Sequence, residues 1–169
     1  MYLTNGKLTI RNALQADSEQ LCAWWNDGAV MAHAGFYNGV GTTAEKIIAE
    51  LAEDSDEKGR RHIIELNGNP IGEMNYRTVD YKTAIIGIKI CDFSEQEKGY
   101  GTALLTMFID GLFQELGYEK IILDTNLNNL CAQHVYEKIG FRKVGIHAWR
   151  DQLGQAQTSV DYELIKKDW

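Results

Sequence analysis

Two glycines one residue apart lie in the stretch QEKGYG at residues 96–101. The stretch follows an apolar run and precedes apolar residues at helical spacing, so we expect it to join a strand to a helix. At such a join the first backbone N–H groups of the helix are unpaired and attract anions, and glycine lets a phosphate come close. We interpret the loop as a phosphate cradle in which Lys98 adds a point charge. The alternative is a turn that only connects the two elements.

Two better-known phosphate loops fit this stretch poorly. A Walker loop needs a glycine followed by Lys and then Ser or Thr, and no such run is present. A Rossmann fingerprint needs a third glycine where Leu104 stands, and it usually follows the first strand of the fold. A Rossmann-type domain remains open as an alternative, and it predicts binding of NAD or ATP in preference to coenzyme A.

The elements around the loop alternate between strands and helices. A capping box is expected to open a helix at Asp17 and another at Thr42, while "NGN" predicts a tight hairpin. Residues 26–41 are rich in glycine and aromatic side chains and are expected to form a loop, and residues 53–59 a charged turn. We expect strands at 7–13, 62–66, 70–77, 83–91, 119–125, 141–149 and 157–165, and helices beginning at Asp17, Thr42, Gly99 and Asn129.

This order predicts a mixed α/β sheet with helices on its faces. The strands before and after the helix at Gly99 should be parallel because a helical crossover connects them, whereas the hairpins should be antiparallel. That helix should bury Leu104, Leu105, Phe108, Leu112 and Leu116, and end near Gly117. No linker or repeat interrupts the chain, so we expect one domain over residues 1–169.

Composition excludes several classes of function. The net charge is −7, from 24 acidic and 17 basic residues, which argues against a nucleic-acid surface and suits a cationic substrate or plain solubility. The three cysteines and four histidines show no metal-ligand spacing, so we predict no metal. The sequence shows no signal pattern and no apolar run of membrane-spanning length, which predicts a cytoplasmic protein.

Two motifs together resemble those of the GNAT N-acetyltransferases. QEKGYG is similar to that family's Q/R-x-x-G-x-G/A signature, and NLCAQHVYEKIGF at 129–141 is similar to its Asn-x-x-Ala-x-x-x-Tyr-Glu-Lys-x-Gly-Phe segment. They stand in the family's order and spacing, with one expected strand between them. The resemblance implies a mostly antiparallel central sheet with a splayed parallel strand pair and flanking helices.

The resemblance also implies acetyl-CoA as cosubstrate. Backbone N–H groups of residues 96–102 would hold the pyrophosphate, and the pantetheine arm would pair with the strand around Ile88 to Ile90. Asn129 would cap its helix and also contact the cofactor. The cofactor-binding residues implied in this way are Ile88, Ile90, Gln96, Lys98, Gly99, Gly101, Thr102, Asn129, Ala132 and Tyr136.

Acetyl transfer to an amine needs a base for the nucleophile and an acid for the leaving thiolate. By resemblance Tyr136 is the general acid; a tyrosine packed on the sheet is the alternative. Asp124, at the end of the strand 119–125, is the candidate base, although a carboxylate there could also simply close the strand. Glu73 is the reserve base, because its strand can face the acceptor cleft.

The acceptor is left open by the sequence. Trp24, Trp25, Phe36 and Tyr37 are expected near the acceptor cleft, with at least one tryptophan in the core. The acidic residues between 50 and 57 are read either as an attraction for polyamines and aminoglycosides or as a solvated turn. The chain resembles the branch with aminoglycoside 6′-N-acetyltransferases and Rim-type protein N-terminal acetyltransferases. A silent acyl-CoA sensor is the alternative function, and a homodimer through strands 141–149 and 157–165 stays open.

Overall fold

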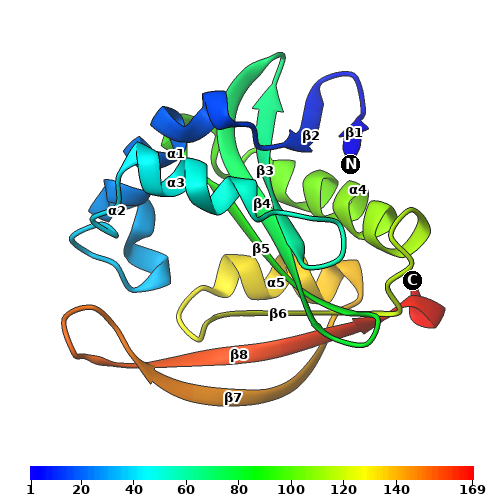
Figure 1. The fold of residues 1–169 in the computed structure, drawn as a ribbon. Helices are drawn as coiled ribbons and strands as arrows, with labels where there is room; N and C mark the ends of the chain where they lie inside the picture. The colour runs from blue at the N-terminus through cyan, green and yellow to red at the C-terminus, as the bar shows by residue number, and fades with distance from the viewer.

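A computed structural model describes all 169 residues. Its eight strands form one sheet in the order β1-β2-β3-β4-β5-β6-β8-β7, in which only β5 and β6 are parallel neighbours. The expected mixed, mostly antiparallel sheet with flanking helices is therefore confirmed (Figure 1). The strands are β1 (Tyr2–Thr4), β2 (Leu8–Asn12), β3 (Gly59–Leu66), β4 (Asn69–Asp80), β5 (Thr83–Ile90), β6 (Lys120–Asn126), β7 (Arg142–Arg150) and β8 (Ala156–Ile165). The helices are α1 (Ser18–Asn26), α2 (Gly28–Met31), α3 (Ala44–Ala52), α4 (Tyr100–Gln114) and α5 (Leu130–Ile139).

The helices cover opposite faces of the sheet. Successive side chains of a strand point to opposite faces, so Ile63 of β3 packs with α1, α2 and α3, while Ile64 packs with α4. The smaller cluster joins Leu21, Trp24, Val30, Met31, Ile47, Ile63 and Cys91. The larger cluster has 22 buried residues and runs beneath the sheet from β2 to β8, with α4 and α5 on its outer side.

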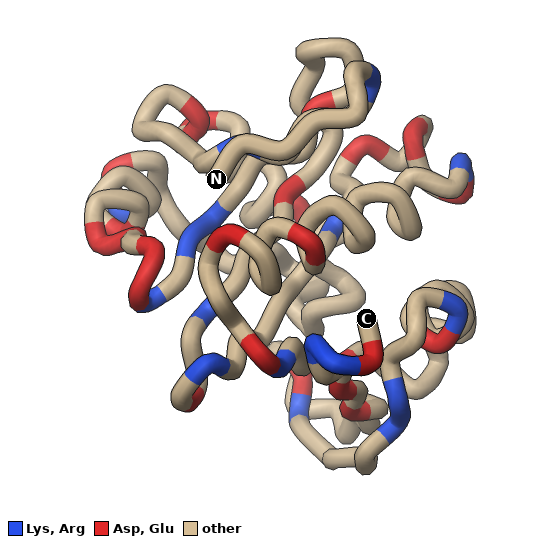
Figure 2. Tube along the Cα trace, turned by 90° about the vertical axis from the view of Figure 1, so that its right-hand side faces the viewer, with Lys and Arg blue, Asp and Glu red and all other residues tan.

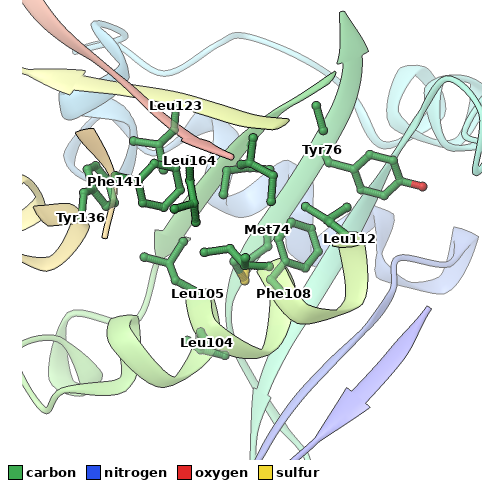
Figure 3. Close-up of a cluster of buried hydrophobic side chains, with 14 of the residues drawn as sticks. Met74, Tyr76, Leu104, Leu105, Phe108, Leu112, Leu123, Tyr136, Phe141 and Leu164 are labelled. Carbon is green, nitrogen blue, oxygen red and sulfur yellow. The ribbon is translucent and has the colours of Figure 1, made fainter. Parts of the chain in front are cut away.

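The α4 helix is the centre of the larger cluster. Leu104, Leu105, Phe108 and Leu112 are each at most 1% exposed, as their helical spacing predicts, and Leu116 packs at the edge. Figure 3 shows Leu105, Phe108 and Leu112 on the side of α4 that faces Met74 and Tyr76 of β4. Leu123, Tyr136 and Phe141 lie farther along the same cluster. Burying one such side chain stabilises the fold by about 1.5–3 kcal/mol, so α4 is firmly anchored.

Several local expectations were wrong in detail. Asp17 precedes α1, but its carboxylate accepts from the Leu14 backbone N–H and from Arg11 instead of capping the helix. The cap of α3 is Thr43, one residue later than expected, because the backbone of Thr42 is already bonded to Asn26. The 26–41 segment contains α2 and a 3₁₀ turn, and β1 was not expected at all.

The membrane and charge observations are simple. No helix of this fold is both long and apolar enough to cross a bilayer. Figure 2 shows basic and acidic residues interleaved along the trace instead of gathered in one region. Part of the acidic run is paired within the fold, since Arg61 pairs with Glu50 and Asp54, and Arg60 pairs with Asp56. This arrangement favours the solvated-turn interpretation of residues 50–57.

One buried polar side chain in the core lacks a hydrogen-bond partner. His62 of β3 is fully buried between the rings of Tyr76 and Phe108, and neither of its ring nitrogens is hydrogen-bonded. Burial disfavours the charged imidazolium and lowers the His62 pKa from 6.5 to about 4. The native state therefore keeps this histidine neutral.

His62 should make the protein sensitive to mild acid. Between pH 6.5 and about 4 the unfolded chain binds this proton and the native chain does not. The free energy of unfolding should then fall as the pH falls, by up to about 1.4 kcal/mol per pH unit. Urea unfolding from about pH 7.5 to 5 checks this, with His62→Phe as the variant that lacks the titrating group. An equal pH slope in variant and wild type would contradict the assignment to His62.

Candidate active site

The parallel strands β5 and β6 diverge soon after they begin. Only three residue pairs join them, the last being Ile85 with Ile122, yet β5 continues to Ile90 and β6 to Asn126. Figure 1 shows β6 and β8 turned away from the direction of β3, β4 and β5. Beyond Ile85 no residue of β6 pairs with β5, so this edge of β5 is open to a ligand that can form hydrogen bonds. The expected splayed pair is therefore present.

A cleft of about 400 Å³ lies where the strands separate. It connects the two faces of the sheet, because Leu123 belongs to the larger core cluster while Asp124 points to the opposite face. Its lining residues come from both separated strands, from α5 and its cap, from the β7–β8 hairpin and from the 3₁₀ turn Ala32–Ala34 after α2. They are His33, Ala34, Ile86, Gly87, Ile88, Lys89, Leu123, Asp124, Thr125, Asn126, Asn129, Tyr136, His147, Trp149 and Ser159.

The glycine loop presents a bare helix N-terminus. Gly99 immediately precedes α4 with φ of +79°, and no side chain caps the helix. A Cβ built at Gly99 or Gly101 would meet nothing within 4 Å, so the space over this backbone is open. Glu97 also has a left-handed φ of +59°, which bends the loop before the helix. The first N–H groups of α4 are thus free to bind an anion.

The polar residues of the loop form hydrogen bonds or ion pairs with other residues of the protein. Gln96 donates from Nε2 to the Ile90 carbonyl at 2.8 Å, which fastens the end of β5 to the loop. Lys98 pairs with Glu95 at 3.0 Å on the surface. Thr102 accepts from Thr106 through its backbone carbonyl. The prediction that these residues bind the cofactor therefore depends on the backbone of the loop and on the Lys98 charge.

Helix α5 carries its own cap and one buried phenol. Asn129 accepts from the Ala132 backbone N–H at 3.2 Å, which confirms it as the helix cap. Tyr136 is 7% exposed and packs against the rings of Tyr162 and Phe141, yet it lines the cleft. Burial, with a further contribution from the Asp124 charge, raises the pKa of Tyr136 to about 12. The phenol is therefore protonated at neutral pH.

Asp124 lies on the other side of the cleft among polar groups that sequence reasoning missed. Its side chain is 44% exposed, and Oδ2 lies 3.9 Å from Nε2 of His147. The other imidazole nitrogen of His147 lies 2.9 Å from Asp161. Deeper in the cleft, Trp149 donates to the buried Ser159 hydroxyl at 2.9 Å. The alternation of side chains in residues 145–149 and 157–165 predicts that both strands present side chains on one shared face. It does not predict that this face lies next to Asp124.

Glu73 does not line the cleft. Its carboxylate is buried in the α1–α3 face and accepts from Trp25 Nε1 at 2.9 Å. Lys89, which does line the cleft, lies 3.4 Å from the same carboxylate oxygen. Glu73 thus links Trp25 to Lys89, and its role as a reserve base stays a prediction. Trp24 is a core residue, as expected for at least one of the two tryptophans.

A strap packs against the β7–β8 hairpin next to the cleft, without lining it. We use this name for residues 35–39, which carry Phe36 and Tyr37 at the surface. The Gln152 side chain accepts from Asn38 N–H and donates to the Gly39 carbonyl, while its backbone N–H donates to the Gly35 carbonyl. At Gly35 a Cβ would lie 2.5 Å from the Trp149 ring, so only glycine allows the strap to sit this close.

A family model described as "Acetyltransferase (GNAT) domain" matches residues 7–142. The chain belongs to the GNAT acetyltransferase family. It is 27% identical, over 160 residues, to an aminoglycoside N(6′)-acetyltransferase type 1 from Klebsiella pneumoniae, and the match covers 84% of this chain and 77% of the relative. A protein of the same description from Serratia marcescens matches equally.

Solved GNAT structures share the fold at lower identity. Spermidine N-acetyltransferase from Vibrio cholerae, in complex with CoA and spermine, has a TM-score of 0.85 at 23% identity, over 97% of this chain and 98% of that one. RimL, a ribosomal L7/L12 alpha-N-protein acetyltransferase in complex with coenzyme A, has a TM-score of 0.85 at 15% identity, over 98% of both chains. Family membership establishes an N-acetyltransferase that uses acetyl-CoA.

The residues present fit acetyl-CoA. The open edge of β5 from Gly87 onward suits an extended arm with amide groups, and the bare N-terminus of α4 suits a pyrophosphate. The empty space over Gly101 leaves room for the anion to touch the backbone. This geometry supports the expected phosphate cradle, which stays a prediction.

Gly101 offers a direct test of this cradle. Replacing Gly101 by Ala should stabilise α4 by about 0.5–1 kcal/mol, because the position is helical and the new methyl group meets nothing. The same methyl group should obstruct the pyrophosphate and raise the Kd for acetyl-CoA by about tenfold, a change near 1.4 kcal/mol. Thermal unfolding and calorimetric titration of the same samples check both effects. Unchanged affinity would place the pyrophosphate elsewhere.

Proposed function

We propose that the protein acetylates a small cationic primary amine by direct attack in a ternary complex. The observation that carries this proposal is that Asp124 and Tyr136 line one cleft from opposite sides, at the gap between β5 and β6. Acetyl-CoA supplies the activated acetyl thioester. The chain supplies a carboxylate for the incoming ammonium and a protonated phenol for the departing sulfur.

Each side chain has a distinct part in the proposed reaction. Asp124 binds the ammonium group of the acceptor and takes its proton, which frees the nitrogen lone pair for attack. The nitrogen attacks the thioester carbonyl, the C–N bond forms and the C–S bond breaks. Tyr136 gives its phenolic proton to the departing sulfur, and the surplus proton of the acylated nitrogen restores the phenol. The raised pKa of Tyr136, about 12, keeps the phenol protonated before the reaction. The rings of Tyr162 and Phe141 cover one side of Tyr136 and limit access of water there.

The shape and charge of the cleft favour a small acceptor. Asp124 and Asp161 place two carboxylates near each other on the acceptor side, which suits an amine with more than one positive charge. The strap, fastened by Gln152, follows His33 and Ala34 of the cleft lining, and we expect it to limit room there for a folded protein or a long peptide. The aminoglycoside relatives supply the first acceptor class to test, and spermidine the second.

A thiol-release assay with a panel of amines tests the proposed function. Neomycin and paromomycin form a matched pair, because paromomycin carries a hydroxyl group where neomycin carries its 6′-amine. We expect thiol release with neomycin or with spermidine and none with paromomycin at that position. Short peptides with free N-termini complete the panel. If the protein binds acetyl-CoA but releases no thiol with any amine, the silent sensor is the better description.

Substitution of the two proposed catalytic side chains should lower turnover more than binding. Asp124→Asn removes the proton acceptor, and Tyr136→Phe removes the proton donor with little change in packing. Each should lower kcat by about 100-fold or more, the usual range for acid–base groups, and change the KM for acetyl-CoA by less than about twofold. Steady-state kinetics on the active amine checks this. Wild-type kcat in either variant would remove that residue from the mechanism.

A further inference from the structure

Three neighbouring strands bring titratable side chains together beside the proposed base. Asp124 of β6 pairs in register with Asp161 of β8, and β8 pairs with β7, which carries His147. One nitrogen or oxygen atom from each of these three side chains lies within 4.8 Å of those from the other two. His147 is 46% exposed, so this group connects the cleft directly to solvent.

The hydrogen bond between His147 and Asp161 fixes the state of the imidazole. His147 Nδ1 lies 2.9 Å and 3.2 Å from the two oxygens of Asp161. A carboxylate accepts only, so neutral His147 must carry its proton on Nδ1 and leave Nε2 as an acceptor. That free nitrogen lies 3.9 Å from Asp124 Oδ2. A movement of the two atoms toward each other by about 1 Å, through rotation of these half-exposed side chains, brings them to hydrogen-bond distance.

We propose that His147 carries the acceptor's proton from Asp124 to solvent, and that Asp161 positions His147 for this transfer. The inference depends on the proposed role of Asp124. The ammonium N–H bond breaks, its electron pair stays on nitrogen, and the proton goes to an Asp124 oxygen. His147 Nε2 then takes this proton from Asp124, and the imidazolium gives a proton to water, which restores both side chains.

Ordinary proton affinities give a reason for such a relay. Carboxylic acids in general ionise near pH 4, so a carboxylate holds a proton only briefly at neutral pH, whereas imidazoles both take and release protons there. Asp161 compensates the positive charge while the imidazole carries the proton. The titratable groups around the relay are Asp124 of β6, Asp161 of β8, Tyr136 of α5, Lys89 of β5 and His33 of the turn after α2.

Kinetics of His147→Gln and Asp161→Asn across about pH 5.5 to 9.5 test the relay. His147→Gln should lower kcat by about tenfold or more, with the KM for acetyl-CoA within about twofold, and should change the dependence of kcat on pH. Asp161→Asn should also lower kcat and change this dependence, because the tautomer is no longer fixed. Added imidazole should partly restore the kcat of His147→Ala.

Controls separate this inference from a structural effect and from the proposed function. His134 is an exposed histidine of α5 outside the cleft lining, and His134→Gln should keep wild-type kinetics. All variants should retain the wild-type Tm, because His147 lies at the surface. A wild-type kcat and pH profile in His147→Gln would overturn the relay and leave Asp124 in place. If the wild-type protein acetylates no amine in the panel, the relay and the proposed function both fail.

Discussion

The short contact between β5 and β6 is the constraint on which the rest of the structure depends. Three residue pairs join these strands, whereas eight join β4 to β5 and seven join β6 to β8. If the parallel pairing continued to the ends of both strands, the sheet would separate its two faces completely. Because it stops at Ile85 and Ile122, the proposed phosphate-binding end of α4 and the proposed catalytic carboxylate, on opposite faces, can serve one reaction.

Hydrophobic packing compensates for the missing strand pairs. The α4 helix follows β5 in the chain and precedes β6, and its apolar face belongs to a core that includes Met74 of β4, Ile121 of β6 and Tyr162 of β8. The core therefore continues beneath the place where the ladder is interrupted. This continuity lets the strands stay apart without a loss of the whole fold, since non-directional apolar burial does not require paired backbones.

The sequence predicts elements that local rules specify and fails where distant segments meet. The Asn67–Gly68 hairpin, the apolar face of α4 and the Asn129 cap all follow from residues close in the chain. The cap of α3 lies one residue later than predicted because the side chain of Asn26, from another helix, is hydrogen-bonded to the backbone N–H and carbonyl of Thr42. The cleft lining around Asp124 required the β6–β8–β7 order, which no local pattern contains. His147 therefore gave no signal as a site residue.

The Gln152 carboxamide joins parts of the chain that are far apart in sequence. It accepts from Asn38 and donates to Gly39, across 113 or more positions, while Gly35 makes room for Trp149. The strap and the β7–β8 turn are thus held together by hydrogen bonds between two distant segments. A substitution that removes the Gln152 carboxamide, or that adds a Cβ at Gly35, therefore disturbs both segments although it alters only one of them.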